Sequence, residues 1–494
     1  MIRIPPVDDV LERSAILPLV LLAAAGAALA GVSMSHAPMV PAALAGVAAV
    51  VIAAVAYQRL PWVPVVVIVA VSALAVAVFL PASAGDEGQR AGLERYGAVS
   101  GAAVMLAAGF TLLSRGRTLT LVHPASATLD RLMLAFAALA LMAGTVGFAS
   151  GNSLSYLAGD VYRIVSLPLI YLVTVHAIEK PAHLRVVLIA LAICIFGQHL
   201  RDAYYAATVF VQNDTTRVKS VFWIQNLVGL LAFVILAFEV RPGLGRMASL
   251  YSAAFLFGVG LSRGFRTYIL TLGLLLVVPL LTRPKKALGL ARGASLAVLL
   301  LGPAVILGAL LIPSIPRFVS EVADSMTHRV QLASNGEDAS ASERSLELSL
   351  VKEQVRSDPM AALIGRGAGT VYQLPLWASP YALQAYADDQ GRIHNVHNSY
   401  GSMVLRTGVG GLIAIVALFA LAIRESFRLV RRWDSLLPWF PFLAIIAYAG
   451  ASPFFYFVPG DVLFAIALGM VGAAYRLGLG QRVTAPGAAG ETAD

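Results

Sequence analysis

Two histidines, His394 and His397, end a long polar segment and stand directly before an apolar run. The unperturbed pKa of imidazole, about 6.5, lets such a side chain take a proton from a hydroxyl near neutral pH. His397 is therefore a candidate general base, and the alternative is that it anchors a helix start together with Asn398. His394 lies three residues earlier, can share a helical face with His397, and is expected to support it.

Two arginines, Arg263 and Arg266, lie in a short segment between apolar runs that are too close together for a real loop. A guanidinium suits phosphate because its planar fork stays charged and donates hydrogen bonds in pairs. The alternative is a tight turn whose arginines reach lipid headgroups. We favour phosphate binding, because the positive-inside bias disfavours arginine in an outer turn that has no use for it.

The elements that position these residues are predicted by composition. The chain has 494 residues, of which 59% are hydrophobic and 13% charged. This is far from a soluble domain and typical of a polytopic membrane protein, whose spans are helical because lipid offers the backbone no partner. The net charge of +9 follows largely from basic cytoplasmic loops, so nucleic acid is not an expected partner. The single cysteine, Cys194, excludes a disulfide within one chain.

Fourteen apolar runs are legible, among them 131–149, 161–178, 398–422 and 458–475. The short loops that share a side with the N-terminus are basic, which predicts a cytoplasmic N-terminus and places the long segment 313–397 outside. We therefore predict an all-α polytopic membrane protein of 12–14 transmembrane helices. Its parts are a bundle (1–312), a periplasmic loop with amphipathic helices (313–397), C-terminal helices (398–475) and a cytoplasmic tail (476–494). Several cations fall at outer ends of runs: Arg163, Arg201, Arg217, Lys219, Arg263 and Arg266.

The loop has its own local signals. Ser340 to Glu343 is a capping-box pattern, apolar residues follow at 346, 348, 350, 351 and 355, and Pro359 ends the helix. Such a helix should lie over the mouth of the bundle. A glycine-rich turn, Ala362 to Gly369, comes next. Aromatic residues then fit sugar stacking and the membrane interface equally well: Tyr372, Trp377, Tyr381 and Tyr386.

A metal site would need Asp388 and Asp389 to join the two histidines. Their spacing matches no common ligand pattern, and an acidic pair in a loop is usually solvated, so we predict no metal and no cofactor. The usual signatures of nucleotide-binding loops, serine hydrolases and zinc proteases are absent from the sequence.

One spacing resembles a known family. His397 and Asn398 are followed by nine residues and then Gly408-Val409-Gly410-Gly411. Together with the upstream Ser-Arg-Gly turn and the glycine-rich segment of the loop, this order resembles the O-antigen ligase and O-antigen polymerase superfamily of Gram-negative inner membranes. The resemblance covers roughly residues 240 to 420.

The resemblance implies a glycosyltransferase that moves a glycan from undecaprenyl pyrophosphate to the lipid A core oligosaccharide on the periplasmic side. It implies that His397 is essential and that pyrophosphate-binding arginines fall on Arg263 or Arg266 and on Arg344. We expect three residues to support them: His394, Asn398 and Arg201.

An activated sugar needs only a base and cations for the leaving group, which predicts an inverting, metal-independent transfer. An O-antigen polymerase and a protein O-glycosyltransferase remain alternatives, because the acceptor site is not legible. A transporter of an anionic substrate is less favoured, because no internal repeat is found.

Overall fold

The computed structural model describes residues 61–66, 68–69, 104, 107–109, 111, 120–184, 186–187, 190, 288, 292, 299, 303, 320, 331, 339–373, 392–394, 396, 398–432 and 458–479, without the side chains of 339–344, 430–432, 458–461 and 463. The described residues are mostly helical. Within them, three helices are long and apolar enough to cross a membrane, at Pro124–Ala149, Leu154–Ala177 and Ser399–Leu429. This supports the coarse prediction of a helical membrane protein, while the predicted number of spans and the domain boundaries stay predictions.

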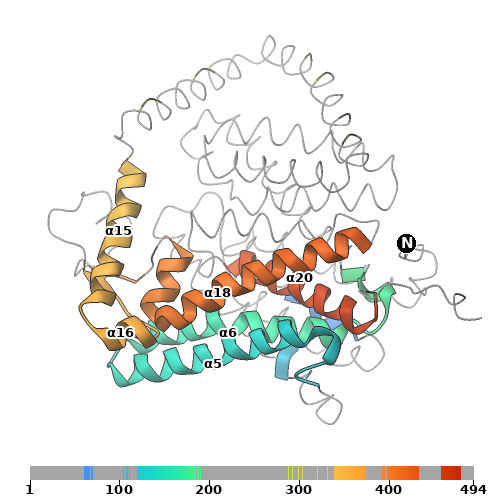
Figure 1. Cartoon of the computed structure of the whole chain (residues 1–494), viewed down its shortest axis with the longest axis horizontal. Coiled ribbons are helices and arrows are strands. Elements are labelled where there is room, and N and C mark those ends of the chain that lie inside the picture. Colours follow the sequence, from blue (N-terminus) through green and yellow to red (C-terminus); the bar gives the residue numbers. More distant parts are fainter. Residues whose placement is uncertain are drawn as a thin grey trace, which may run out of the picture.

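The first two candidate spans form a helical hairpin. Helix α5 (Ala127–Ala149) follows the short 3-10 helix η2 (Pro124–Ser126), and α6 (Leu154–Ala177) returns beside it (Figure 1). Small residues on α5 are buried against the neighbours, and a Cβ added at Gly144 would lie 3.0 Å from Val161 Cγ2 of α6. Small side chains let helices approach closely in lipid, where the hydrophobic effect does not drive helices together.

The third span, α18 (Ser399–Arg432), packs against α5, and α20 (Val458–Arg476) packs against α6 (Figure 1). Asn398 caps α18, because its Oδ1 accepts from the backbone N–H groups of Tyr400 and Gly401 at 2.9 and 3.1 Å. The predicted run ended at 422, but the helix continues. Its last turns are polar and carry an ion pair of 3.1 Å between Arg428 and Glu425.

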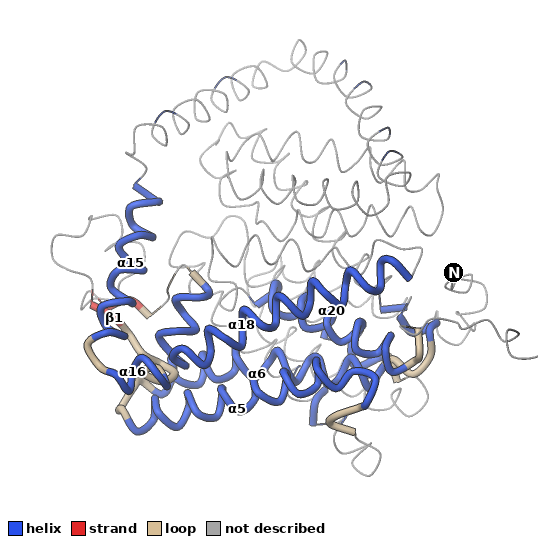
Figure 2. The backbone as a smooth tube through the Cα atoms, in the orientation of Figure 1, coloured by secondary structure: helices blue, strands red, loops and turns tan. Residues whose placement is uncertain are grey.

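Between residues 339 and 398, the described parts of the chain form two helices and a strand pair (Figure 2). Helix α15 (Ala339–Arg356) is followed by α16 (Pro359–Ile364), whose N-terminus is capped by Asp358. Strand β1 (Tyr372–Gln373) pairs antiparallel with β2 (Arg392–Ile393). A small core of Val351, Tyr372, Ile393, Val396 and Leu405 joins α15, the strands and α18. The strand pair therefore positions His394, the residue after β2, near the start of α18.

The prediction for α15 is confirmed at its end and wrong at its start. The helix ends at Arg356, directly before Ser357-Asp358-Pro359, as predicted. The helix already includes Ala339 and Ser340, so it begins before the position that the capping-box pattern predicts. The predicted apolar face packs inward through residues 346, 350, 351 and 355, while Leu348 is 40% exposed.

The two ends of the described helices differ in chemistry. At one end, the buried carboxylate of Asp130 accepts from Ser126 Oγ and Tyr171 OH, both at 2.7 Å, and from Arg476 Nη2 at 3.1 Å. This cluster ties α5, α6 and α20 together, and the same end carries Arg424 and Arg428 of α18, the side predicted to be cytoplasmic. The α5–α6 turn, α16 and the start of α18 gather at the opposite end (Figure 1).

Candidate functional site

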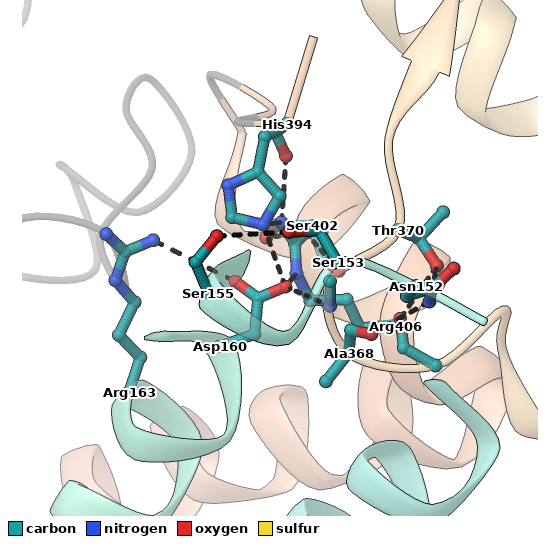
Figure 3. Close-up of polar contacts among 12 residues, drawn as sticks. Asn152, Ser153, Ser155, Asp160, Arg163, Ala368, Thr370, His394, Ser402 and Arg406 are labelled. Carbon is teal, nitrogen blue, oxygen red and sulfur yellow. Dashed lines mark hydrogen bonds and ion pairs between the residues drawn. The ribbon is translucent and has the colours of Figure 1, made fainter. Parts of the chain in front are cut away.

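Three distant segments meet on one carboxylate at the end of the bundle opposite the basic helix ends (Figure 3). Asp160, in the second turn of α6, is buried, and its Oδ2 lies 2.6 Å from Arg406 Nε of α18 and 3.0 Å from His394 Nε2. The backbone N–H of Gly369 donates to the same oxygen at 2.7 Å. A charge buried near apolar helices is costly unless it is paired, and such groups usually have a function.

Arg406 is held on all sides by this network. Its Nη1 donates to Ser402 Oγ at 2.7 Å and to the Ser402 carbonyl at 3.3 Å, and its Nη2 donates to the His394 carbonyl at 2.9 Å. The Arg406 side chain is 2% exposed, so water does not screen its charge, and the carboxylate of Asp160 compensates that charge instead. This fixes the backbone of His394 as well as its ring.

The His394 ring stacks on Tyr156 of α6, with ring centroids 4.3 Å apart and an interplanar angle of 11°. It lies at the border of the buried network, 13% exposed. Burial lowers the pKa of His394, and the opposing effect of the Asp160 carboxylate does not restore it, so the ring is neutral near pH 7. Because an ionised carboxylate only accepts hydrogen bonds, the ring proton lies on Nε2, and Nδ1 is the acceptor nitrogen.

Arg163 adds a second guanidinium to the cluster. It lies one turn after Asp160 on α6, with Nη1 at 3.9 Å from Asp160 Oδ1, and is 25% exposed (Figure 3). Arg163 was among the cations predicted at outer helix ends, and it does lie at the same end as the loop elements. The cluster thus has an excess of positive charge, since one carboxylate faces two arginines.

The glycine-rich segment predicted in the loop docks on a break in α18. Gly408 has φ 66° and ψ −160°, which interrupts the helix. The backbone N–H groups of Arg366 and Gly367 donate to the carbonyls of Leu405 and Arg406, at 2.7 and 3.2 Å. A Cβ at Gly408 would lie 2.4 Å from the Leu363 carbonyl oxygen, so only glycine permits this approach.

The same segment also contacts the α5–α6 hairpin. The Ala368 N–H donates to the Ala143 carbonyl at 2.7 Å, and Asn152 Nδ2 donates to the Ala368 carbonyl at 2.8 Å and to Thr370 Oγ1 at 3.1 Å (Figure 3). With the bond from Gly369 to Asp160, the segment is anchored to α5, α6 and α18. It therefore holds the loop and the buried cluster in one fixed arrangement.

Only some of the predicted site residues can be placed. His394 and Asn398 are described: His394 contacts Asp160, and Asn398 caps α18. Their predicted support of the catalytic and pyrophosphate-binding residues stays a prediction. Arg344 falls within α15, but its side chain is not described. Outside the described residues lie His397, Arg201, Arg263 and Arg266.

No group of three metal-ligating side chains occurs among the described residues, and Asp388, Asp389 and His397 are not among them. The prediction of a metal-independent reaction therefore stays a prediction.

One aromatic prediction is wrong. Tyr372 contacts neither sugar nor membrane, because it is 1% exposed and its hydroxyl donates to Glu347 Oε1 at 2.8 Å. Burial raises the pKa of Tyr372 well above its usual value, so it stays a neutral donor. Its role is to hold β1 against α15. Trp377, Tyr381 and Tyr386 lie outside the described residues.

The sequence patterns did not predict Asp160 and Arg406 as site residues. Asp160 could have been identified as a charged residue at the edge of the apolar run 161–178. Arg406 could have been identified as a charged residue among the nine residues between Asn398 and Gly408. No protein-family model matches the chain, and no curated protein matches it significantly.

Proposed function

We propose that this chain is a glycosyltransferase of the O-antigen ligase type, which transfers a glycan from undecaprenyl pyrophosphate to a sugar hydroxyl of the lipid A core. One observation carries the proposal. The glycine-rich segment and the His-Asn-x9-Gly-x-x-Gly segment, each of which resembles a segment of that family, dock on each other at Gly408. Asp160 of α6 accepts from Gly369 of the first segment and from Arg406 of the second, and His394 contacts the same carboxylate oxygen.

The proposed reaction is one displacement. The acceptor hydroxyl oxygen bonds to the anomeric carbon while the bond from that carbon to the pyrophosphate oxygen breaks. The pyrophosphate leaves with the electron pair, and the proton of the hydroxyl passes to the imidazole of His397. Attack from the face opposite the leaving group inverts the configuration.

The leaving pyrophosphate requires positive charge. Arg163 is the described candidate, because it is partly exposed beside the buried cluster. Arg263, Arg266 and Arg344 are proposed to complete the set, and guanidinium forks can bind the pyrophosphate without a metal. Arg406 serves differently, since its donors are taken up by Asp160, Ser402 and His394.

His394 is proposed as a positioning residue for His397. Its ring is held by Asp160 and Tyr156 and its carbonyl by Arg406, so the chain leading to His397 starts from a fixed point. Asn398, which follows His397 in the sequence, caps α18. The proposed role of these two neighbours is to pre-organise the base for proton transfer.

The proposed location is the inner membrane, with 12–14 helices and the site on the periplasmic side. The basic ends of α18 and α20 support this orientation, because cytoplasmic segments attract arginine and lysine, and the site lies at the other end.

A deletion strain tests the proposal directly. We expect the strain to lose long glycan from its lipopolysaccharide and to accumulate full-length lipid-linked polymer. Reintroducing the intact gene should restore the long glycan on lipopolysaccharide. Capping by a single repeat would instead indicate a polymerase, and unchanged lipopolysaccharide would reject both enzymes. With purified protein, transfer should persist in EDTA, and a loss restored by a divalent ion would contradict the metal-independent step.

A further inference from the structure

Exposed apolar side chains form stripes on two adjacent candidate spans. On α5 the stripe is Leu134, Leu141 and Phe148, at intervals of seven residues, and on α18 it is Val409, Ile413 and Val416. Such spacing places each set on one side of its helix. Because both helices are long and apolar enough to span a membrane, these stripes have the character expected of a surface that lipid covers.

Helix α16 continues this surface at the loop end. A Cβ added at Gly408 would lie 2.4 Å from the Leu363 carbonyl oxygen. The backbone of Leu363 therefore lies beside Gly408, the residue directly before Val409. Met360 and Leu363 are 59% and 64% exposed, and their spacing of three places them on the same side of α16. Ala361 on the other side is buried.

The helix before α16 has the opposite character. The exposed residues near the end of α15 include Lys352, Glu353 and Arg356. Two consecutive helices thus expose charged groups and then large apolar groups, with Asp358 between them as the cap of α16. Such a change is expected where a chain passes from water to hydrocarbon, and it lies beside Gly408, at the start of the α18 stripe.

We propose that α16 lies in the lipid interface of the leaflet nearest the loop, with Met360 and Leu363 inserted among the acyl chains. The occupant of this apolar face is bilayer lipid, because the face is continuous with the lipid-covered stripe of α18. A short helix with an apolar side and no spanning length binds membranes in this way. The contact holds the glycine-rich segment, and through it Asp160, at a fixed depth.

The test uses the full-length chain with Cys194 replaced by Ser and single cysteines introduced by Met360→Cys or Leu363→Cys. Lys352→Cys on α15 is the matched control. Each variant is labelled with bimane and placed in liposomes of phosphatidylethanolamine and phosphatidylglycerol. Lipids brominated on the acyl chains should quench the label at 360 and 363 and leave the label at 352 bright. A membrane-impermeant maleimide should react several-fold more slowly at 360 and 363 than at 352.

Two results would overturn the proposal. Unquenched labels that react as fast as residue 352 would place α16 in water. Labels that are shielded from maleimide but not quenched would show that protein covers the face, such as a second copy of this chain. Gel filtration verifies folding, and two separate positions keep the test decisive if one cysteine is not tolerated. Neither result depends on the proposed glycosyltransferase activity.

Discussion

Arg406 Nε donates to Asp160 Oδ2 at 2.6 Å across 246 residues of sequence, and both side chains are buried. This ion pair is the central link between α6 and α18 at the loop end. Because both charges are desolvated, removing one partner of this pair should cost more stability than removing one partner of an exposed pair.

Arg406→Met should destabilise the protein by about 3–5 kcal/mol, because it leaves the Asp160 carboxylate buried without its cation. The double variant with Asp160→Asn should recover much of this loss, since it removes both charges. Thermal unfolding in detergent measures each effect. The control is Arg424→Ala, whose side chain is 51% exposed beside Glu425 and should cost no more than about 1 kcal/mol. Equal losses for Arg406 and Arg424 would refute a special role for the buried pair.

His397→Ala should lower glycan transfer by about 10²–10⁴-fold if His397 is the general base. His394→Gln should lower it less, because a glutamine amide can still donate to Asp160 while the Tyr156 stacking is lost. Transfer assays with purified protein and lipid-linked glycan measure both. Full activity of His397→Ala would exclude it as the base, and a larger loss in His394→Gln would move that role to His394.

The lowered pKa of His394 predicts a loss of stability in mild acid. In the unfolded chain the imidazole titrates near 6.5, and in the folded protein it binds its proton only at lower pH. Between the folded and the unfolded pKa, the unfolded state therefore binds more protons than the folded state. The contribution of His394 to the unfolding free energy is fully present above about pH 6.5 and decreases as the pH falls to the folded pKa. One group changes the unfolding free energy by at most about 1.4 kcal/mol per pH unit.

The measurement is the melting temperature between neutral and mildly acidic pH, compared with that of His394→Gln. The variant should show a weaker decline, because the other titrating groups are unchanged. Parallel curves for both proteins would mean that His394 does not carry the effect.

Gly408→Ala should destabilise the protein by roughly 1–3 kcal/mol, because the residue has a positive φ and the new methyl would collide with the Leu363 carbonyl. Gly410→Ala is the matched control, since the nearest atom to its Cβ is Leu139 Cδ2 at 3.9 Å. It should be neutral or stabilise the helix by up to about 1 kcal/mol. Limited proteolysis should release the segment around α16 faster in Gly408→Ala only, and similar behaviour of both variants would argue against the docking described here.

Local patterns predicted much of this arrangement and none of its central contact. Pro359 marks the end of α15, and the hydropathy of residues 131–149 and 458–475 predicts α5 and α20 to within a few residues, because these signals lie within single helices. The contact between Asp160 and Arg406 depends on the tertiary arrangement of α6 and α18, which the hydrophobic periodicity of a single helix cannot predict. The break at Gly408 was not predicted either, because it forms where the loop backbone approaches, and an isolated glycine in an apolar run does not reveal that approach.

The interruption of α18 has a consequence for how the protein is made. A helix entering the bilayer normally satisfies its own backbone, but the Leu405 and Arg406 carbonyls accept hydrogen bonds from Arg366 and Gly367, which belong to a segment translated earlier. The final shape of α18 is therefore reached only once residues 359–369 have folded against it. Completion of α18 and folding of the segment that contains α16 are therefore coupled steps.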